Sequence, residues 1–258
     1  MGSRHRPKVR VIVAGVAAAA LAVVLGVTIA LTLTAPKADT AEVSAYNSAH
    51  ATLPAQKFMP GVLYIGDSYT GGSKEGGDNA NGWPALVRSD MAKAGFDTGS
   101  ALLARGGSGY VTVGPSGENF GQALAEQKYL DLDVVVVFGS INDTNQTAAA
   151  VGDAARKLYV EIKKQSPRAK LVVVGPSWMN DVPVPEMYPM RDQLKAAAAD
   201  AGATWVDPLA DKWFTGAAAS MIGSDKTHPN NAGHRYMADF LTPVIEAVVK
   251  QVYADHKQ

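Results

Sequence analysis

Ser68, Asp225 and His228 are the residues of this sequence whose types and spacing best suit nucleophilic chemistry. Ser68 follows Gly66-Asp67 directly after an apolar run, and a sharp turn at the glycine would expose the serine hydroxyl. Asp225 and His228 are three residues apart, and residues so spaced in a turn lie within about 7 Å. The aspartate could then bind one ring nitrogen of the histidine and leave the other as a base. The pattern predicts a serine nucleophile that a histidine activates.

Each of these residues also has a purely structural explanation. A serine after a strand often caps a helix, and His228 could be a surface histidine. The remaining histidines are poorer candidates for acid–base work. His5 and His256 lie near the two ends of the chain, His50 lies in a predicted linker, and His234 has no neighbouring acid spaced to orient it.

Two further segments could stabilise a developing negative charge. After the second apolar run, Gly106, Gly107 and Gly109 would let the backbone approach a ligand closely and aim an amide at it. After the third run, Asn142 offers a neutral side-chain amide that can donate to an oxyanion. An ordinary loop, and a helix cap by Asn142 or Asp143, explain the same residues. A phosphate loop is disfavoured, because no Gly-Lys-Ser/Thr follows the glycines.

The elements that would hold these residues alternate along the chain. Five short apolar runs predict buried parallel strands, at residues 62–65, 100–103, 133–138, 170–174 and 204–206. Helical patterns lie between and after them, at residues 83–94, 147–164, 187–201 and 231–254, the last with a bend expected at Pro243. This alternation predicts a three-layer α/β domain with its site at the carboxyl ends of the strands.

Four short blocks, in this order, resemble the SGNH hydrolase family, also called GDSL esterases/lipases. They are Gly66-Asp67-Ser68, Gly109, Gly139-x-x-Asn142 and Asp225-x-x-His228. The resemblance covers roughly residue 60 to the end of the chain. It implies the flavodoxin-like SGNH fold, in which helices cover both faces of a five-stranded parallel sheet.

The resemblance also implies roles for these residues in the hydrolysis of a carboxylic ester. Ser68 would attack the carbonyl, His228 would act as base and then acid, and Asp225 would orient the histidine. The amides of Ser68 and Gly109 and the side chain of Asn142 would form the oxyanion hole. No cofactor and no metal is implied. The second block of the family usually opens with Asn, and Ala104 stands there, which leaves the choice among the three glycines less certain.

Three aromatic residues are predicted to wall the substrate pocket, namely Tyr69, Trp178 and Trp213. Trp178 and Trp213 could equally be core aromatics at a sheet edge. Residues 71–82, just past the serine, are rich in glycine and hold no large apolar side chain. Because each buried methylene stabilises a bound chain by about 0.8 kcal/mol, a loop of this kind predicts short acyl groups.

The amino terminus predicts export. Residues 11–35 hold no charge over 25 positions, and as a helix they would span about 37 Å, against about 30 Å for a bilayer core. The expected organisation is a basic cytoplasmic tail (1–10), a transmembrane signal anchor (11–35), a linker (36–60) and an SGNH hydrolase domain (61–258) outside the cell membrane. A long signal peptide cut near Ala38 or Ala41 is the alternative, and it would secrete the domain.

The sequence thus predicts an extracytoplasmic serine esterase that removes acetyl or short acyl groups from a polar or glycan alcohol. The expected partners are a small-molecule, glycan or lipid ester and the membrane. A net charge of zero argues against nucleic acid, and the absence of cysteine excludes disulfides and thiolate sites. Two alternatives stay open: an acyltransferase that uses the same triad on a sugar hydroxyl, and a noncatalytic glycan-binding module.

Overall fold

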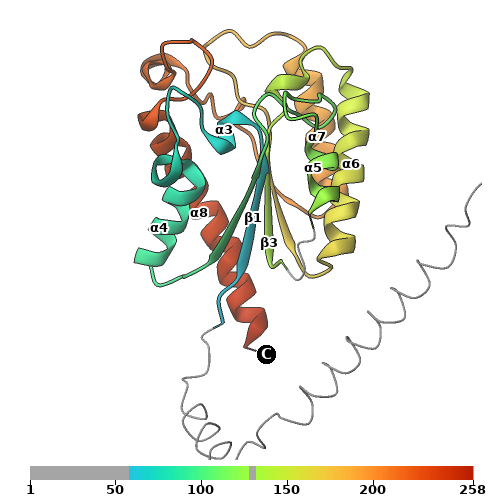
Figure 1. Ribbon diagram of the computed structural model, residues 1–258, viewed down its shortest axis with the longest axis vertical. Coiled ribbons are helices and arrows are strands. Elements are labelled where there is room, and N and C mark those ends of the chain that lie inside the picture. The colour runs from blue at the N-terminus through green and yellow to red at the C-terminus, as the bar shows by residue number, and fades with distance from the viewer. Residues whose placement is uncertain (1–57, 128–131, 258) are drawn as a thin grey trace, which may run out of the picture. The chain divides into compact units, whose positions relative to one another are not determined.

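Five parallel strands form the centre of the part of the chain that the computed structural model describes, residues 58–127 and 132–257 (Figure 1). They are β1 (Gly61–Gly66), β2 (Gly99–Ala104), β3 (Val134–Phe138), β4 (Lys170–Val174) and β5 (Thr204–Val206). Every predicted strand is present, with its ends within one residue of the prediction. The order in the sheet is β2-β1-β3-β4-β5, a doubly wound arrangement whose switch point lies between β1 and β3.

Helices cover both faces of this sheet. Figure 1 shows α4 (Trp83–Lys93) and α8 (Asn231–His256) on one side, and α5 (Phe120–Glu126), α6 (Ala148–Gln165) and α7 (Met187–Asp200) on the other. The predicted three-layer α/β architecture is therefore confirmed. Only α5 among these helices was not expected. It has seven residues, too few to show an apolar stripe, and a capping box between Asn119 and Gln122 begins it.

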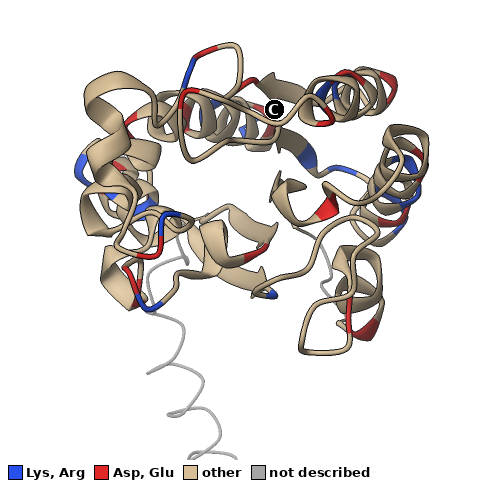
Figure 2. Ribbon diagram, turned by 90° about the horizontal axis from the view of Figure 1, so that it is seen from above, with Lys and Arg blue, Asp and Glu red and all other residues tan. Residues whose placement is uncertain are grey.

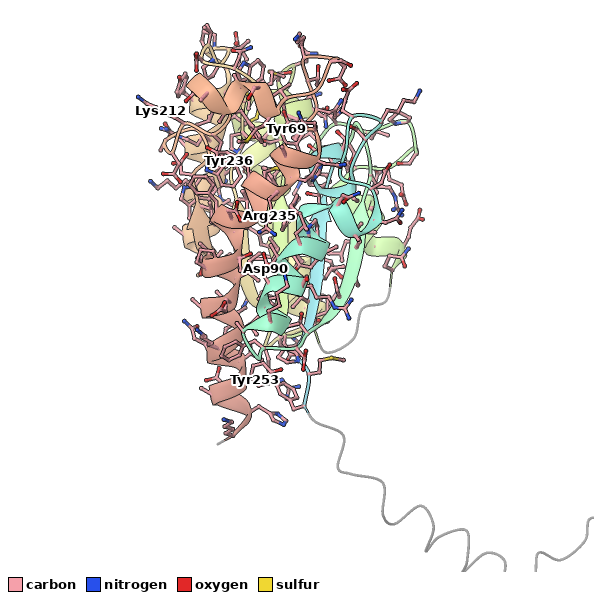
Figure 3. All side chains as sticks on the ribbon, turned by 90° about the vertical axis from the view of Figure 1, so that its left-hand side faces the viewer. Tyr69, Asp90, Lys212, Arg235, Tyr236 and Tyr253 are labelled. Atoms are coloured by element: carbon pink, nitrogen blue, oxygen red, sulfur yellow. The ribbon has the colours of Figure 1, made fainter. Side chains whose placement is uncertain are left out.

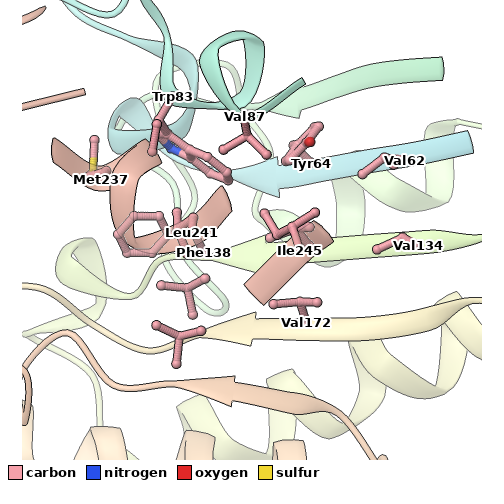
Figure 4. Close-up of a cluster of buried hydrophobic side chains, with 14 of the residues drawn as sticks. Val62, Tyr64, Trp83, Val87, Val134, Phe138, Val172, Met237, Leu241 and Ile245 are labelled. Atoms are coloured by element: carbon pink, nitrogen blue, oxygen red, sulfur yellow. The ribbon is translucent and has the colours of Figure 1, made fainter. Parts of the chain in front are cut away.

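The strands read as continuous apolar runs because the sheet is buried on both faces. Alternate side chains enter two separate cores, so that Val62 and Tyr64 face one and Leu63 and Ile65 face the other. Figure 4 shows the first core, in which Trp83 and Val87 of α4 and Met237, Leu241 and Ile245 of α8 lie over the strands. These residues hold the strand ends, and the loops that follow them, in fixed positions.

α8 runs through Pro243 without ending. An ion pair between Arg235 and Asp90, 2.7 Å long, links α8 to α4, and both residues are labelled in Figure 3. Charged residues of both signs are spread over the helices and loops around the sheet (Figure 2). No helix in the described ranges has the length and hydropathy to cross a membrane. The predicted signal anchor at residues 11–35 lies outside the described residues.

Candidate active site

Ser68 lies on a tight turn at the carboxyl end of β1. It is the first residue of α3 (Ser68–Gly71), and the preceding Asp67 caps this helix by accepting the amide of Tyr69 on Oδ1 at 2.8 Å. Gly66 makes the turn possible, since a methyl group there would lie 2.6 Å from the carbonyl oxygen of Phe138. Ser68 is half-buried, and its amide has no hydrogen-bond partner among the described residues.

A second turn, before α8, brings a histidine and an aspartate to this serine. His228 Nε2 lies 3.0 Å from Ser68 Oγ, and His228 Nδ1 lies 2.6 Å from Asp225 Oδ2. Asp225 Oδ1 accepts the amides of Thr227 and His228, each at 2.9 Å. The hydrogen bond from the His228 ring, helped by these two amides, lowers the pKa of Asp225 to about 2. The structure therefore brings together the three residues that the sequence predicts as a triad.

This arrangement can activate the serine hydroxyl. An ionised Asp225 favours the tautomer in which Nδ1 carries the proton, and Nε2 of His228 is then free to accept the proton of Ser68. The turn that carries Asp225 and His228 is also fixed by Tyr69, whose hydroxyl donates to the carbonyl oxygen of Thr227 at 2.6 Å.

Tyr69 itself differs from the prediction. It is 2 % exposed, and its ring packs in the core against Phe138 and Phe214, so it supports the histidine turn and does not wall a substrate pocket. Trp178 and Trp213, the other two predicted pocket residues, both line one cavity, but Trp213 is 1% exposed and packs in the core against Phe138, so for Trp213 the prediction of a core aromatic holds as well.

The loop after β2 depends on a buried aspartate that sequence reasoning treats only as a possible helix cap. Asp143 accepts three backbone amides of this loop, those of Tyr110 at 2.8 Å, Val111 at 3.2 Å and Thr112 at 2.8 Å. Its neighbour Asn142 uses Nδ2 to donate to the Ser108 carbonyl oxygen at 2.8 Å. These contacts fix the loop from residues more than thirty positions away.

The amide of Gly109, the predicted oxyanion donor, already has a hydrogen-bond acceptor. This amide donates to the carbonyl oxygen of Thr112 at 2.9 Å, and a methyl group at Gly109 would lie 2.3 Å from the Asp143 carboxylate. Gly106 is the better placed glycine. A methyl group there would lie 4.0 Å from Ser68 Cβ, and no described residue accepts the Gly106 amide. The choice of Gly109 as donor stays a prediction, and the free amide of Gly106 makes that glycine a second candidate.

Asp67 is an acid beside the nucleophile that sequence reasoning missed as a titrating group. It is fully buried, and burial raises its pKa to about 7 despite the hydrogen bond from the Tyr69 amide. Its Oδ2 accepts from Asn142 Nδ2 at 3.2 Å, so this carboxyl links the serine turn to the loop after β3. The described residues include no cluster of three histidine or acidic side chains that could hold a metal ion.

Residues 72–82, the glycine-rich segment after α3, are tied to the histidine turn and to α8. The carboxylate of Glu75 accepts the amide of Ser224 at 2.6 Å and its hydroxyl at 3.0 Å. The amide of Gly77 donates to Asn231 Oδ1 at 2.9 Å, and a methyl group at Gly77 would overlap the ring of His234. Glu75 thus connects the loop that follows the nucleophile directly to the residue before Asp225.

Comparison with known proteins agrees with this geometry. The sequence profile of the GDSL-like lipase/acylhydrolase family matches residues 64–236. The chain belongs to this family. This GDSL protein is 38% identical over 188 residues to a curated relative, the GDSL lipase Rv0518 of Mycobacterium tuberculosis. The match covers 71% of this chain and 80% of that protein. The predicted resemblance is confirmed, and the GDSL chain is a carboxylic ester hydrolase.

Solved structures show the same GDSL fold at low identity. A carbohydrate esterase family 2 enzyme from Corynascus thermopiles has a TM-score of 0.59 and 22% identity, over 77% of this chain and 68% of its own. A family two carbohydrate esterase from Clostridium thermocellum, solved with cellohexaose, has a TM-score of 0.57 and 19% identity, over 76% and 66%.

Proposed function

We propose that Ser68, His228 and Asp225 hydrolyse carboxylic esters through an acyl-enzyme. The observation that carries the proposal is the continuous contact from Ser68 Oγ through the His228 ring to Asp225, with distances of 3.0 Å and 2.6 Å. His228 takes the proton of Ser68 as the hydroxyl attacks the ester carbonyl, and then gives it to the departing alcohol. Water then attacks the acyl-enzyme, with His228 again acting first as base and then as acid, and the carboxylic acid is released from Ser68.

The oxyanion of each tetrahedral intermediate needs hydrogen-bond donors that lie together beside Ser68 and point at the oxyanion. We assign this role to the free amides of Ser68 and Gly106, and to the side chain of Asn142, which the family pattern supplies. Asn142 Nδ2 is already within 3.2 Å of Asp67 and 2.8 Å of the Ser108 carbonyl oxygen. The longer bond, to Asp67, is the one we expect to weaken when the oxyanion forms.

The proposed substrate is an acetyl or short acyl ester of a polar or glycan alcohol, met outside the cytoplasm. The segment after the serine, residues 72–82, holds no large apolar side chain to cover a long chain. The two structural neighbours named above are carbohydrate esterases, one of them solved with cellohexaose, which supports a glycan ester. The uncharged residues 11–35 support an extracytoplasmic location, by a membrane anchor or by secretion.

Labelling with a fluorophosphonate probe tests the nucleophile. The wild-type protein and a Ser73→Ala control, with a serine removed five positions away, should both be labelled and should both hydrolyse nitrophenyl acetate. Ser68→Ala should lose labelling and turnover while keeping its circular dichroism spectrum, because the half-buried hydroxyl supports no core packing. Labelled Ser68→Ala protein, or near-normal turnover by it, would exclude Ser68 as the nucleophile.

A further inference from the structure

A cavity of about 350 Å³ lies between the loop after β4 and the loop after β5. This volume is within the range of small-ligand pockets. The amide of Gly216 donates to Asp181 Oδ1 at 2.9 Å, a bond that joins the two loops. The residues that matter most for recognition come from both sides, namely Trp178, Asn180, Asp181, Tyr188, Lys212 and Trp213.

The cavity lies at the same end of the domain as the nucleophile. Both of its loops leave the carboxyl ends of their strands, as the Ser68 turn does, and Figure 3 shows Lys212 and Tyr69 at that end. In the sheet, β4 and β5 are two and three positions from β1, which at about 4.8 Å per strand is about 10–14 Å. Phe214, next to Trp213, packs against Tyr69 with ring centroids 6.3 Å apart. A group in the cavity would therefore belong to a part of the substrate remote from the ester.

The walls combine aromatic surface with hydrogen-bonding groups of both kinds. Trp178 is half-buried and Tyr188 is 43% exposed, so their rings can face a ligand. The indole N–H groups of Trp178 and Trp213 are buried without a partner in the described structure, and an unpaired buried donor is costly. Asp181 and Lys212 carry opposite charges, so the site has no net preference for an anion or a cation.

The backbone around Trp213 is held in an uncommon conformation. Lys212 and Phe214, its two neighbours, have φ values of 52° and 58°, in the left-handed region that favours glycine. Non-glycine residues keep such angles only where the surrounding structure fixes them, and they cluster at ligand sites. Here they place a tryptophan against the cavity.

We propose that this cavity is a subsite for a neutral sugar ring, in a glycan that carries the ester at Ser68 on another of its residues. The apolar C–H face of a pyranose suits the rings of Trp178 and Tyr188, and its hydroxyls suit the surrounding donors and acceptors. The kinetic part of the inference rests on the proposed function, whereas the binding part does not.

Binding is tested first, without catalysis. Titration of the wild-type protein with cellohexaose or xylohexaose, neither of them acetylated, should change tryptophan fluorescence in a saturable way. Trp178→Ala should weaken this binding by about tenfold, and Tyr188→Ala offers a second variant at an exposed side chain with little risk to folding. Val182→Ala is the matched control, because Val182 lies on the same loop, is 77% exposed and does not line the cavity.

Kinetics then tests the link to the ester. For partially acetylated forms of the two sugars, KM should rise about tenfold in Trp178→Ala and Tyr188→Ala and should stay at the wild-type value in the Val182→Ala control. Absence of saturable binding to the wild-type protein, or equal binding by the variants, would overturn the subsite. Wild-type protein that binds the sugars but cleaves no ester would leave the subsite standing and remove the proposed function instead.

Discussion

Replacing Asp67 with asparagine should change how the stability of this protein depends on pH. Asp67 is fully buried, and burial raises its pKa from 3.8 to about 7. Between these values the folded state keeps a proton that the unfolded state has released, so stability falls as the pH rises through this range. At about 1.4 kcal/mol per pKa unit, the loss between pH 5 and pH 8 amounts to about 2–3 kcal/mol.

His234 has the opposite effect over nearly the same range. It is fully buried in the first turns of α8, and burial lowers its pKa from 6.5 to about 4. Its stabilising contribution is complete above pH 6.5 and is lost as the pH falls toward 4, a loss of about 2 kcal/mol between pH 8 and pH 5. Together, Asp67 and His234 should leave the wild-type stability almost independent of pH, and Asp67→Asn should reveal the His234 contribution.

Urea unfolding in steps from pH 5 to pH 8 measures this effect. The free energy of unfolding should be compared between Asp67→Asn and the wild type at each pH. The value for the variant minus that for the wild type should increase by about 2–3 kcal/mol from pH 5 to pH 8. Hydrogen bonds lost in the variant would shift this difference by the same amount at every pH. Asp153→Asn, a change at an exposed aspartate on α6, is the control and should track the wild type. A difference for Asp67→Asn that stays constant with pH would refute the raised pKa and the role of burial in it.

Three further outcomes follow from the site. Asp225→Asn should lose roughly 10⁴ in kcat, measured on nitrophenyl acetate, because the histidine would adopt the wrong tautomer; a loss below tenfold would contradict the orienting role. Gly109→Ala should lower the free energy of unfolding by about 1–3 kcal/mol through overlap with the Asp143 carboxylate, whereas Gly106→Ala, whose methyl group would lie 4.0 Å from Ser68 Cβ, should leave stability unchanged; equal destabilisation by the two changes would contradict the tight packing of Gly109. Among nitrophenyl esters, acetate to butyrate should react fastest, and faster turnover of decanoate or palmitate would favour a lipid substrate.

The fold was predictable because its signals are local. Each strand is an apolar run bounded by polar or turn residues, and burial on both faces keeps that run unbroken. The long helices show their apolar stripes over three or more turns. α5 has only seven residues, so the one signal that could have found it was the pair Asn119 and Gln122, with the spacing of a capping box.

The parts of the site that were not predictable depend on contacts between distant residues. The Gly109 amide is taken by the carbonyl oxygen of Thr112, and the Asp143 carboxylate fixes that part of the loop through the amides of Tyr110 to Thr112. Tyr69 was expected in a pocket, but its position beside the serine fits inward packing equally well, and only contacts with distant residues, Phe138, Phe214 and Thr227, show which occurs. The order of the four blocks located the triad, because those residues lie at strand ends and turns that the topology brings together.

The attachment of residues 72–82 has a consequence for how substrate reaches Ser68. This segment is held through Glu75 to Ser224 and through Gly77 to Asn231, at both ends of the histidine turn. Swinging it away would break the contacts beside Asp225 and His228. We propose that an enzyme held in this way takes its substrate one molecule at a time from water, and we expect its rate to rise smoothly with ester concentration, with no jump where the ester begins to form micelles.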